Sequence, residues 1–211
     1  MPSSKLSRHS YHHGDLANAL TGAALELARA GGPEAVVLRE AARQIGVSAT
    51  AAYRHFNSRE DLIHAVKDCA LTELAERMQQ ELEATAAADD TVEALAARMR
   101  ALGHGYISFA LEKPGLFRTA FHHSEPMTGR QGMDPLETAP FQMLMRILDR
   151  LVELGAIDPQ RRPYLGMFAW ATAHGVADLL LDGPLRNFPP EVQRAAVQHA
   201  LDATVAGILA R

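Results

Sequence analysis

The stretch from Leu38 to Phe56, LREAARQIGVSATAAYRHF, constrains the fold more than any other part of the chain. Its first half carries apolar residues at helical spacing, which indicates a short helix with one buried face. Gly46 then stands where a left-handed residue closes a helix. The hydroxyl of Ser48 can accept hydrogen bonds from the free amides that open the next helix. Two short helices joined by such a turn form a helix-turn-helix, whose second helix can enter the major groove of DNA.

The segment GVSATAAYRHFNSREDL also resembles the signature of the TetR family of bacterial transcriptional regulators. The matching positions are Gly46, Val47, Ser48, Tyr53, His55, Phe56, Ser58, Glu60 and Leu62. Two other segments resemble one branch of that family: YHHGDL at 11–16, and WATAHG at 170–175. In the second segment, Trp170, His174 and Gly175 resemble a C-terminal Trp-His-Gly (WHG) domain. The resemblance therefore covers nearly the whole chain.

The resemblance implies an all-α protein that regulates transcription. An N-terminal three-helix domain with the helix-turn-helix would bind DNA, and a C-terminal helical domain would bind a ligand and form a homodimer. The resemblance implies a repressor, and we expect a small-molecule ligand to release it from a quasi-palindromic operator. The main alternative is a helical ligand-binding or interaction protein without operator-specific DNA binding.

Composition supports the same fold class. Hydrophobic residues make up 47% of the chain, and alternating runs typical of strands are absent, which favours an all-α fold. A chain of 211 residues can bury a sizeable core. We expect about nine helices in three parts. These are a flexible arm over 1–13, a helix-turn-helix domain over 14–60, and a regulatory and dimerisation domain over 61–211.

Caps and helix breakers predict the limits of the helices, and Ser58-Arg59-Glu60-Asp61 and Asp90-Thr91-Val92-Glu93 each read as a capping box that opens a helix. The first should run over 15–30 and end at Gly31-Gly32-Pro33. The family usually has Ser or Thr just before the second helix, but Val36 and Val37 stand there, so a cap worth about 1 kcal/mol is missing. The remaining long helices are expected over about 58–84, 90–111, 134–155, 163–181 and 190–208, with a short one over 114–121 and a loop over 122–132. Pro140 can move the start of the 134–155 helix to a later residue.

The charge is unevenly distributed along the chain. The net charge is -4, but residues 1–59 hold seven Lys and Arg residues against four acidic ones. Screening limits the reach of remote charges to about 8–10 Å, so a phosphate backbone would meet this local excess. The sequence therefore predicts a small basic head on an acidic body.

The cysteine count and the apolar runs bear on the compartment. Cys69 is the only cysteine, which excludes an intrachain disulfide and suits a reducing compartment. No apolar run approaches the roughly 18 residues of a bilayer span. The polar start MPSSKLSRHS lacks the hydrophobic section of a signal peptide. We expect a soluble, cytoplasmic protein.

Residues of the second helix are the candidates for reading DNA bases. Arg54 can reach a guanine edge or a phosphate, and Thr50 can contact either group. The methyl group of Ala51 can meet a thymine methyl. The resemblance implies phosphate contacts, or packing that frames them, for Tyr53 and His55.

Two further residues complete the predicted DNA-binding set. Arg59 stands where the family often has Lys, which implies a phosphate contact, and Ser48 can touch phosphate as well as cap the helix. Each residue of the set can instead be an ordinary exposed or capping side chain. One such helix covers few base pairs, so a dimer on two half-sites is expected. Its affinity should fall steeply with salt.

Aromatic and Met residues in the body predict an apolar pocket for an unknown small-molecule effector. The candidate lining residues are Met99, His104, Tyr106, Phe109, Phe117, Phe121, Met143, Trp170 and His174. The alternative is that these residues form an ordinary core, and for His174 a structural or dimer-proximal role is the favoured interpretation. Gly103 and Gly105 weaken the middle of a helix and can allow close approach of a neighbour.

The last two predicted helices are apolar or small on nearly all sides, so each needs cover on more than one face. We expect a homodimer in which they form a four-helix bundle with their copies. The alternative is that both helices are buried within one subunit.

Other functional classes find less support in the sequence. The GxSxG, Walker, dinucleotide-binding and HExxH motifs are absent, so we expect neither an enzyme nor a cofactor. His9, His12 and His13 can bind metal adventitiously, but no Cys or carboxylate set accompanies them, so no metal site is expected. The arm that carries them can touch DNA or remain a disordered tail.

Overall fold

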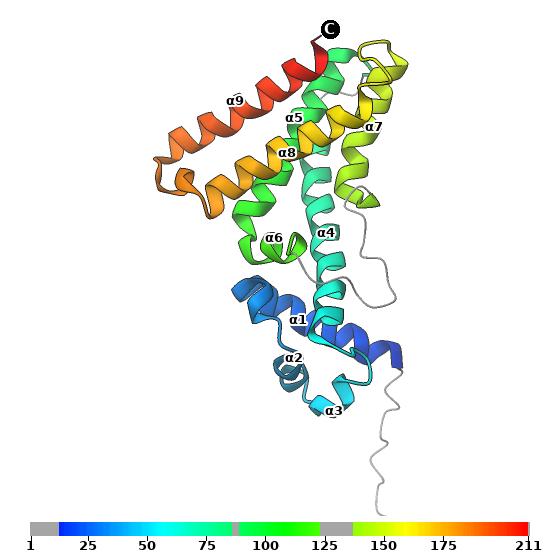
Figure 1. Ribbon diagram of the computed structural model, residues 1–211, viewed down its shortest axis with the longest axis vertical. Helices are drawn as coiled ribbons and strands as arrows, with labels where there is room; N and C mark the ends of the chain where they lie inside the picture. Colours follow the sequence, from blue (N-terminus) through cyan, green and yellow to red (C-terminus); the bar gives the residue numbers. More distant parts are fainter. Residues whose placement is uncertain (1–12, 86–88, 123–136, 211) are drawn as a thin grey trace, which may run out of the picture.

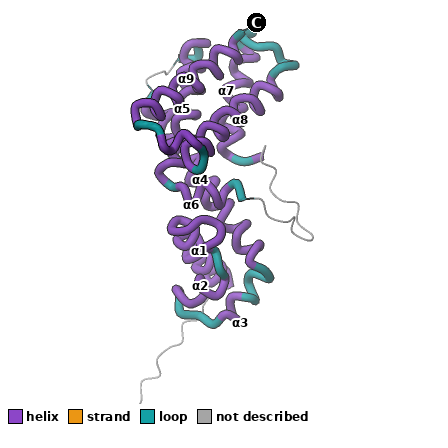
Figure 2. Tube along the Cα trace, turned by 60° about the vertical axis from the view of Figure 1, so that its left-hand side comes forward, coloured by secondary structure: helices purple, strands orange, loops and turns teal. Residues whose placement is uncertain are grey.

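The computed structural model describes residues 13–85, 89–122 and 137–210, and these ranges contain nine α-helices and no strand. The all-α prediction is confirmed. Figure 1 shows an elongated molecule in which α1–α3 form one end and α8 and α9 lie at the other. Figure 2 shows the same order from a second direction. The helices are α1 (His13–Ala35), α2 (Leu38–Gln44), α3 (Ala49–Ala52), α4 (Arg59–Ala84), α5 (Val92–Glu112), α6 (Pro114–Ala120), α7 (Ala139–Glu153), α8 (Arg162–Leu181) and α9 (Pro190–Leu209).

α1 breaks where the sequence predicted its end. Gly31 and Gly32 leave helical geometry, and Gly32 has a φ of 71°. One further short turn follows from Pro33 to Ala35, because Pro is well suited to the first turn of a helical segment. The turn leads directly to Val37, which precedes α2 without a side-chain cap, as predicted from its apolar side chain.

The end formed by α1–α3 contributes a part of the hydrophobic core that is made largely of Ala and Leu. Small side chains let short helices approach closely, so the core needs few large residues. The start of α4 completes it. The buried members are Leu20, Ala24, Ala28, Leu38, Ala41, Ala42, Ala52, Phe56, Leu62, Ile63 and Val66.

α4 connects this end to the rest of the molecule. Its 26 residues span about 39 Å, and it packs against α1, α5, α6 and α7. The Ser58 hydroxyl accepts a hydrogen bond from the Asp61 amide at 3.1 Å, which confirms the predicted cap. The predicted end near Ala84 is confirmed as well.

α5 begins at a second predicted cap, where the Thr91 hydroxyl accepts from the Ala94 amide at 3.1 Å. Its two central glycines permit close packing. A Cβ on Gly105 would stand 2.6 Å from the Cα of Met78 on α4, and one on Gly103 would overlap the side chain of Leu201 on α9. The expected close approach is therefore confirmed.

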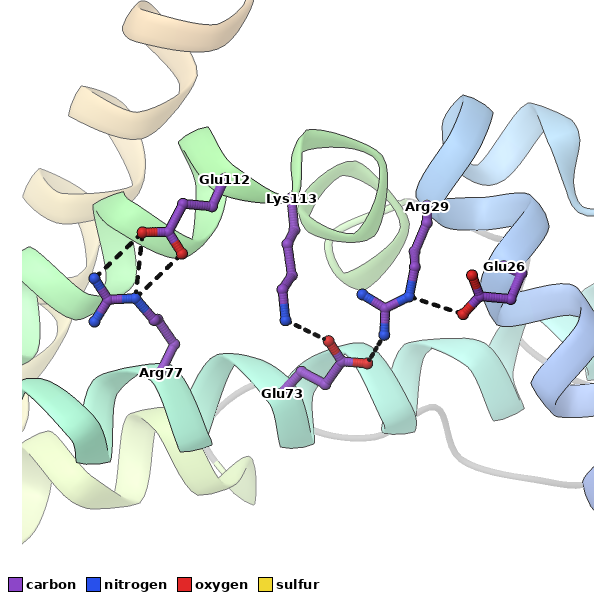
Figure 3. A network of polar contacts seen from close by, with 6 residues as sticks. All are labelled: Glu26, Arg29, Glu73, Arg77, Glu112 and Lys113. Carbon is purple, nitrogen blue, oxygen red and sulfur yellow. Dashed lines mark hydrogen bonds and ion pairs between the residues drawn. The ribbon is translucent and has the colours of Figure 1, made fainter.

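An ion-pair network holds α1, α4 and the α5–α6 junction together (Figure 3). Glu73 of α4 accepts from the Arg29 guanidinium of α1 and from Lys113 Nζ at 2.8 Å. One turn further along α4, Arg77 pairs with Glu112 at 3.2 Å. Nearby, α6 lies so close to α1 that a Cβ on Gly115 would overlap the backbone of α1.

α7 begins at Ala139 with Pro140 in its first turn, so Pro140 does move the start to a later residue than the predicted 134. Of the predicted 122–132 loop, only residue 122 is described. Residues 123–132 and Asp134 lie outside the described residues. α8 and α9 match the predicted 163–181 and 190–208 helices closely. Among the described helices, none combines the length and the apolar composition that a bilayer span requires.

Candidate nucleic-acid interface and cavity

The turn between α2 and α3 is closed by local backbone bonds. Gly46 has a φ of 74°, the left-handed conformation that glycine adopts without a Cβ penalty. The Val47 amide donates to the Ala42 carbonyl at 2.9 Å, which satisfies an end carbonyl of α2. The Ser48 hydroxyl accepts from the Ala51 amide at 3.1 Å. These bonds confirm the helix-turn-helix geometry and set the direction of α3.

α3 lies at the tip of the molecule (Figure 1). It has one buried and one exposed side. Ala52 and Phe56 are buried toward the core of this end. Thr50 and Arg54 are exposed, and Tyr53 keeps 46% of its surface accessible. The side chains predicted to read base edges therefore stand on an outer ridge that a DNA groove can receive.

The recognition segment is a shorter α-helix than the sequence suggested. α-Helical geometry ends at Ala52, and the amides of Arg54 and His55 then donate to carbonyls three residues back. Such bonds tighten the last turn of a helix. The tight turn brings the chain within a few residues to Ser58, the cap of α4. His55 is half-buried in this turn and has an interaction of its own.

Arg59 has a role inside the molecule that sequence reasoning missed. Its Nε donates to the Val36 carbonyl at 2.9 Å and its Nη2 to the Pro33 carbonyl, while its Nη1 pairs with Glu60. Arg59 thus ties the start of α4 to the segment before α2. Only a hydrogen-bond donor array as wide as guanidinium can span these acceptors. The predicted phosphate contact of Arg59 stays a prediction.

Three arginines of the helix-turn-helix segment are exposed at this end of the molecule. Arg39 and Arg43 lie on α2, and Arg54 lies in the tight turn that follows α3. Arg43 hydrogen-bonds to Glu40, and this bond lowers the pKa of the Glu40 carboxyl. Arg39 and Arg54 therefore contribute most of the field that a phosphate would meet.

A cavity of about 470 Å³ opens within the body, between α4, α5, α7, α8 and α9. Five of the predicted lining residues lie on its wall: Met99, Tyr106, Phe121, Trp170 and His174. The volume is in the range that holds small organic molecules.

Tyr106 organises the aromatic part of this wall. Its hydroxyl accepts from Trp170 Nε1 at 3.3 Å and lies 2.8 Å from His174 Nδ1. Burial raises the pKa of Tyr106 far above its usual value, so the phenol is neutral. The tautomer in which the phenol donates to His174 Nδ1 satisfies both groups and places the imidazole proton on Nε2. The Phe121 ring lies 4.7 Å from the His174 ring.

The other four predicted lining residues, His104, Phe109, Phe117 and Met143, lie off this wall. Helical phase explains this on α5, because the wall takes the face with Met99 and Tyr106, while His104 and Phe109 lie on other faces. Phe117 is buried behind Phe121, at 4.9 Å between ring centres.

Two wall residues on α4 escaped sequence reasoning. Lys67 Nζ donates to the His122 carbonyl, and burial lowers the pKa of Lys67. His64 Nε2 is buried and has no hydrogen-bond partner among the described residues. The sequence pattern that could have identified them is a pair of polar residues spaced i, i+3 beside the apolar stripe of α4.

The outer face of α8 is apolar and exposed. Tyr164 keeps 77% of its surface accessible, Phe168 47%, Met167 44% and Leu179 41%. These residues recur at helical spacing and form one stripe, which the subunit itself does not cover. Exposed α9 residues next to it are small, such as Ala203 and Gly207.

Across the described residues, no group of three or more His, Cys, Asp or Glu side chains is placed to hold a metal ion. His9 and His12 of the predicted arm lie outside the described residues, so the structure does not bear on the arm.

Two family models match this chain, one in its N-terminal part and one in its C-terminal part. A family model described as bacterial regulatory proteins, tetR family, matches residues 20–66. A second, described as tetracyclin repressor-like, C-terminal domain, matches residues 99–204, which is half of the chain. A comparison with curated proteins found no match.

Solved structures share the fold along nearly the whole chain. A protein of unknown function from Rhodococcus sp. RHA1 is 27% identical with a TM-score of 0.74, and the match covers 96% of this chain and 100% of that one. A tetR-family transcriptional regulator from Streptomyces coelicolor is 22% identical with a TM-score of 0.62, over 94% and 90% of the two chains. A TetR variant from Acinetobacter baumannii AYE, in complex with minocycline, is 18% identical with a TM-score of 0.62, over 96% of each chain. The last two likenesses bear on the fold alone.

Proposed function

The chain belongs to the tetR family of bacterial regulatory proteins, and we propose that a small molecule releases it, as a repressor, from a quasi-palindromic operator. It is a DNA-binding transcriptional regulator with a helix-turn-helix at one end and a ligand-binding domain at the other. This family is regulatory rather than enzymatic. The proposal depends most on one observation: Thr50 on α3 and Arg54 in the turn after it are both exposed and follow the turn closed by Gly46 and Ser48.

The proposed DNA contacts follow from which side chains α3 exposes. Thr50, Ala51 and Arg54 meet base edges in the major groove. Ser48 and Tyr53 flank them and meet phosphates, as do His55 and Arg59 where their internal contacts allow. Residues 14–60 form the DNA-binding domain and residues 61–211 the regulatory domain, with α4 extending from one into the other.

The proposed homodimer forms through α8 and α9. The apolar stripe of α8, which includes Tyr164 and Phe168, is too exposed for an isolated subunit and would be covered by a second copy. Such a four-helix bundle fixes the spacing of two α3 helices, which must fit successive major grooves. Because DNA is the target, we place the homodimer in the cytoplasm.

The proposed effector occupies the cavity between α4 and α9. The wall of this cavity includes residues of α4. Arg59, in the first turn of the same helix, hydrogen-bonds to the segment before α2. A ligand can release DNA only if it binds the DNA-free conformation more tightly than the bound one. The minocycline complex of the Acinetobacter protein supports a small-molecule role for this fold. The branch with the Trp-His-Gly domain remains our finer assignment, on Trp170, His174 and Gly175.

Selection of operators from random double-stranded DNA tests this function. We expect enrichment of a quasi-palindrome whose half-sites are one helical turn or a multiple apart, with affinity that falls steeply as salt is raised. Failure to enrich any sequence would favour the alternative, a ligand-binding or interaction protein without operator-specific binding.

A further inference from the structure

The cavity is polar at one end and apolar at the other. Its wall on α4 runs from His64 to Met78, and the fourteen helical steps between these two residues correspond to about 21 Å. The end nearer the DNA-binding helices carries His64, Lys67 and His122. The far end is lined by apolar side chains, including Met78, Met99, Leu102, Leu201 and Val205.

The polar end has hydrogen-bond donors to spare. Lys67 Nζ donates to the His122 carbonyl, and the ammonium keeps further protons for another acceptor. His64 lies one turn before Lys67 on the same face of α4, and its buried Nε2 has no partner among the described residues. A buried polar nitrogen without a partner is costly, and in the tautomer that carries the imidazole proton on Nε2 an acceptor from the cavity satisfies it.

Nearby carboxylates limit how much negative charge that acceptor can carry. Asp68 lies on the same wall and has an interaction of its own. Glu60, one turn before His64, pairs with Arg59 and keeps a buried carboxylate oxygen. A dianion such as a phosphate ester would be repelled by both, whereas a single carboxylate can be matched by the one ammonium of Lys67.

We propose that the cavity binds an amphipathic organic acid, with its single carboxylate on Lys67 Nζ and His64 Nε2 and its apolar body along the far wall. This inference rests on the proposed function, because it names the chemical class of the effector for the same cavity. The aromatic middle of the wall, formed by Tyr106, Phe121 and Trp170, accepts a chain or a ring of the ligand.

The chain contains a built-in reporter for this test. Trp170 is its only tryptophan and lies on the cavity wall. The full-length protein is titrated with decanoate and phenylvalerate, and with the neutral matches decanol and phenylpentanol, while Trp170 fluorescence is followed and calorimetry checks the Kd. We expect each acid to bind at least about tenfold more tightly than its alcohol, the usual value of a charge-assisted hydrogen bond. Equal Kd values for acid and alcohol, or no binding of either acid, would overturn the proposal.

Variants locate the carboxylate. Lys67→Met should raise the Kd of the acids about 10- to 100-fold and leave that of the alcohols nearly unchanged. Lys67→Arg should retain most of the preference for acids. Lys113→Met is the matched control, because it removes an ammonium that pairs with Glu73 away from the cavity, and it should bind both probes as the parent does.

Circular dichroism verifies that each variant folds, and His64→Leu serves in place of Lys67→Met if the latter does not. An unchanged acid Kd in whichever of these two variants is folded would contradict the assignment.

A gel shift on the selected operator separates this inference from the proposed function. Release of DNA by the acids but not by the alcohols supports both. DNA binding that neither acid affects overturns the ligand class and leaves DNA-binding regulation standing, whereas an absence of DNA binding contradicts only the proposed function.

Discussion

At the residue scale, Gly46 carries the turn between α2 and α3. Its φ of 74° lies in the left-handed region, where a side chain clashes with its own backbone. A Cβ there meets no neighbouring atom within 4 Å, so the cost of a substitution comes from the backbone alone.

We expect Gly46→Ala to lower the free energy of unfolding by about 1–2 kcal/mol, measured by urea denaturation. Gly22→Ala is the matched control. Gly22 lies inside α1 with open space around it, so alanine there should raise stability by roughly 0.5–1 kcal/mol. Equal effects of the two substitutions would mean that the turn does not need a left-handed residue.

Arg54, exposed in the turn after α3, is the residue of the recognition segment best suited to recognise a base. Arg54→Ala should weaken operator binding by about 1–3 kcal/mol if the guanidinium bonds a guanine edge. The measurement is fluorescence anisotropy on operator and on random DNA, and the loss should fall mainly on the operator. Arg194→Ala, on exposed α9 far from α3, controls for the loss of one positive charge. An equal loss on both DNAs would assign Arg54 to phosphate instead.

At the scale of elements, Glu73 links three segments through one carboxylate. It lies on α4, accepts from Arg29 of α1 and Lys113 before α6, and keeps only 17% of its side chain exposed. Partial burial weakens solvent screening, so these pairs contribute more than surface pairs do.

We expect Glu73→Gln to lower the free energy of unfolding by about 1–2 kcal/mol, because two cations lose their counter-charge in a partly buried site. Glu40→Gln is the control, since Glu40 pairs with Arg43 on the surface, and stability should hardly change. Both variants are compared by thermal and urea unfolding. A loss that vanishes at low salt, where ion pairs are strongest, would contradict the electrostatic explanation.

At the scale of the whole molecule, the exposed apolar stripe of α8 bears on whether the protein is a monomer or a homodimer. We expect Phe168→Glu to turn the proposed homodimer into a monomer, because a buried carboxylate without a partner disfavours the interface. Sedimentation velocity measures the mass, and operator binding should weaken in parallel as two linked half-sites become one. Leu111→Glu changes an equally exposed apolar residue outside α8 and α9 and should leave the dimer intact. A Phe168→Glu protein that remains dimeric would place the interface elsewhere.

Local features were predictable from the sequence because they depend on neighbours a few residues away. The turn at Gly46, the caps at Ser48, Ser58 and Thr91, and the break at Gly32 are all set by short-range backbone bonds. Helical periodicity also determined the all-α class, since a buried face must repeat about every 3.6 residues. The outward position of Thr50 and Arg54 follows from the same period.

Only the tertiary structure decided which residues meet across the molecule. Arg59 bonds carbonyls more than twenty residues away, and Lys67 reaches the His122 carbonyl, which no local pattern indicates. The cavity wall likewise depends on the rotation of each helix about its axis, so Tyr106 faces the cavity while Phe109 on the same helix is buried elsewhere. Sequence periodicity gives a helix an apolar face, but packing against other helices determines which part of that face borders empty space.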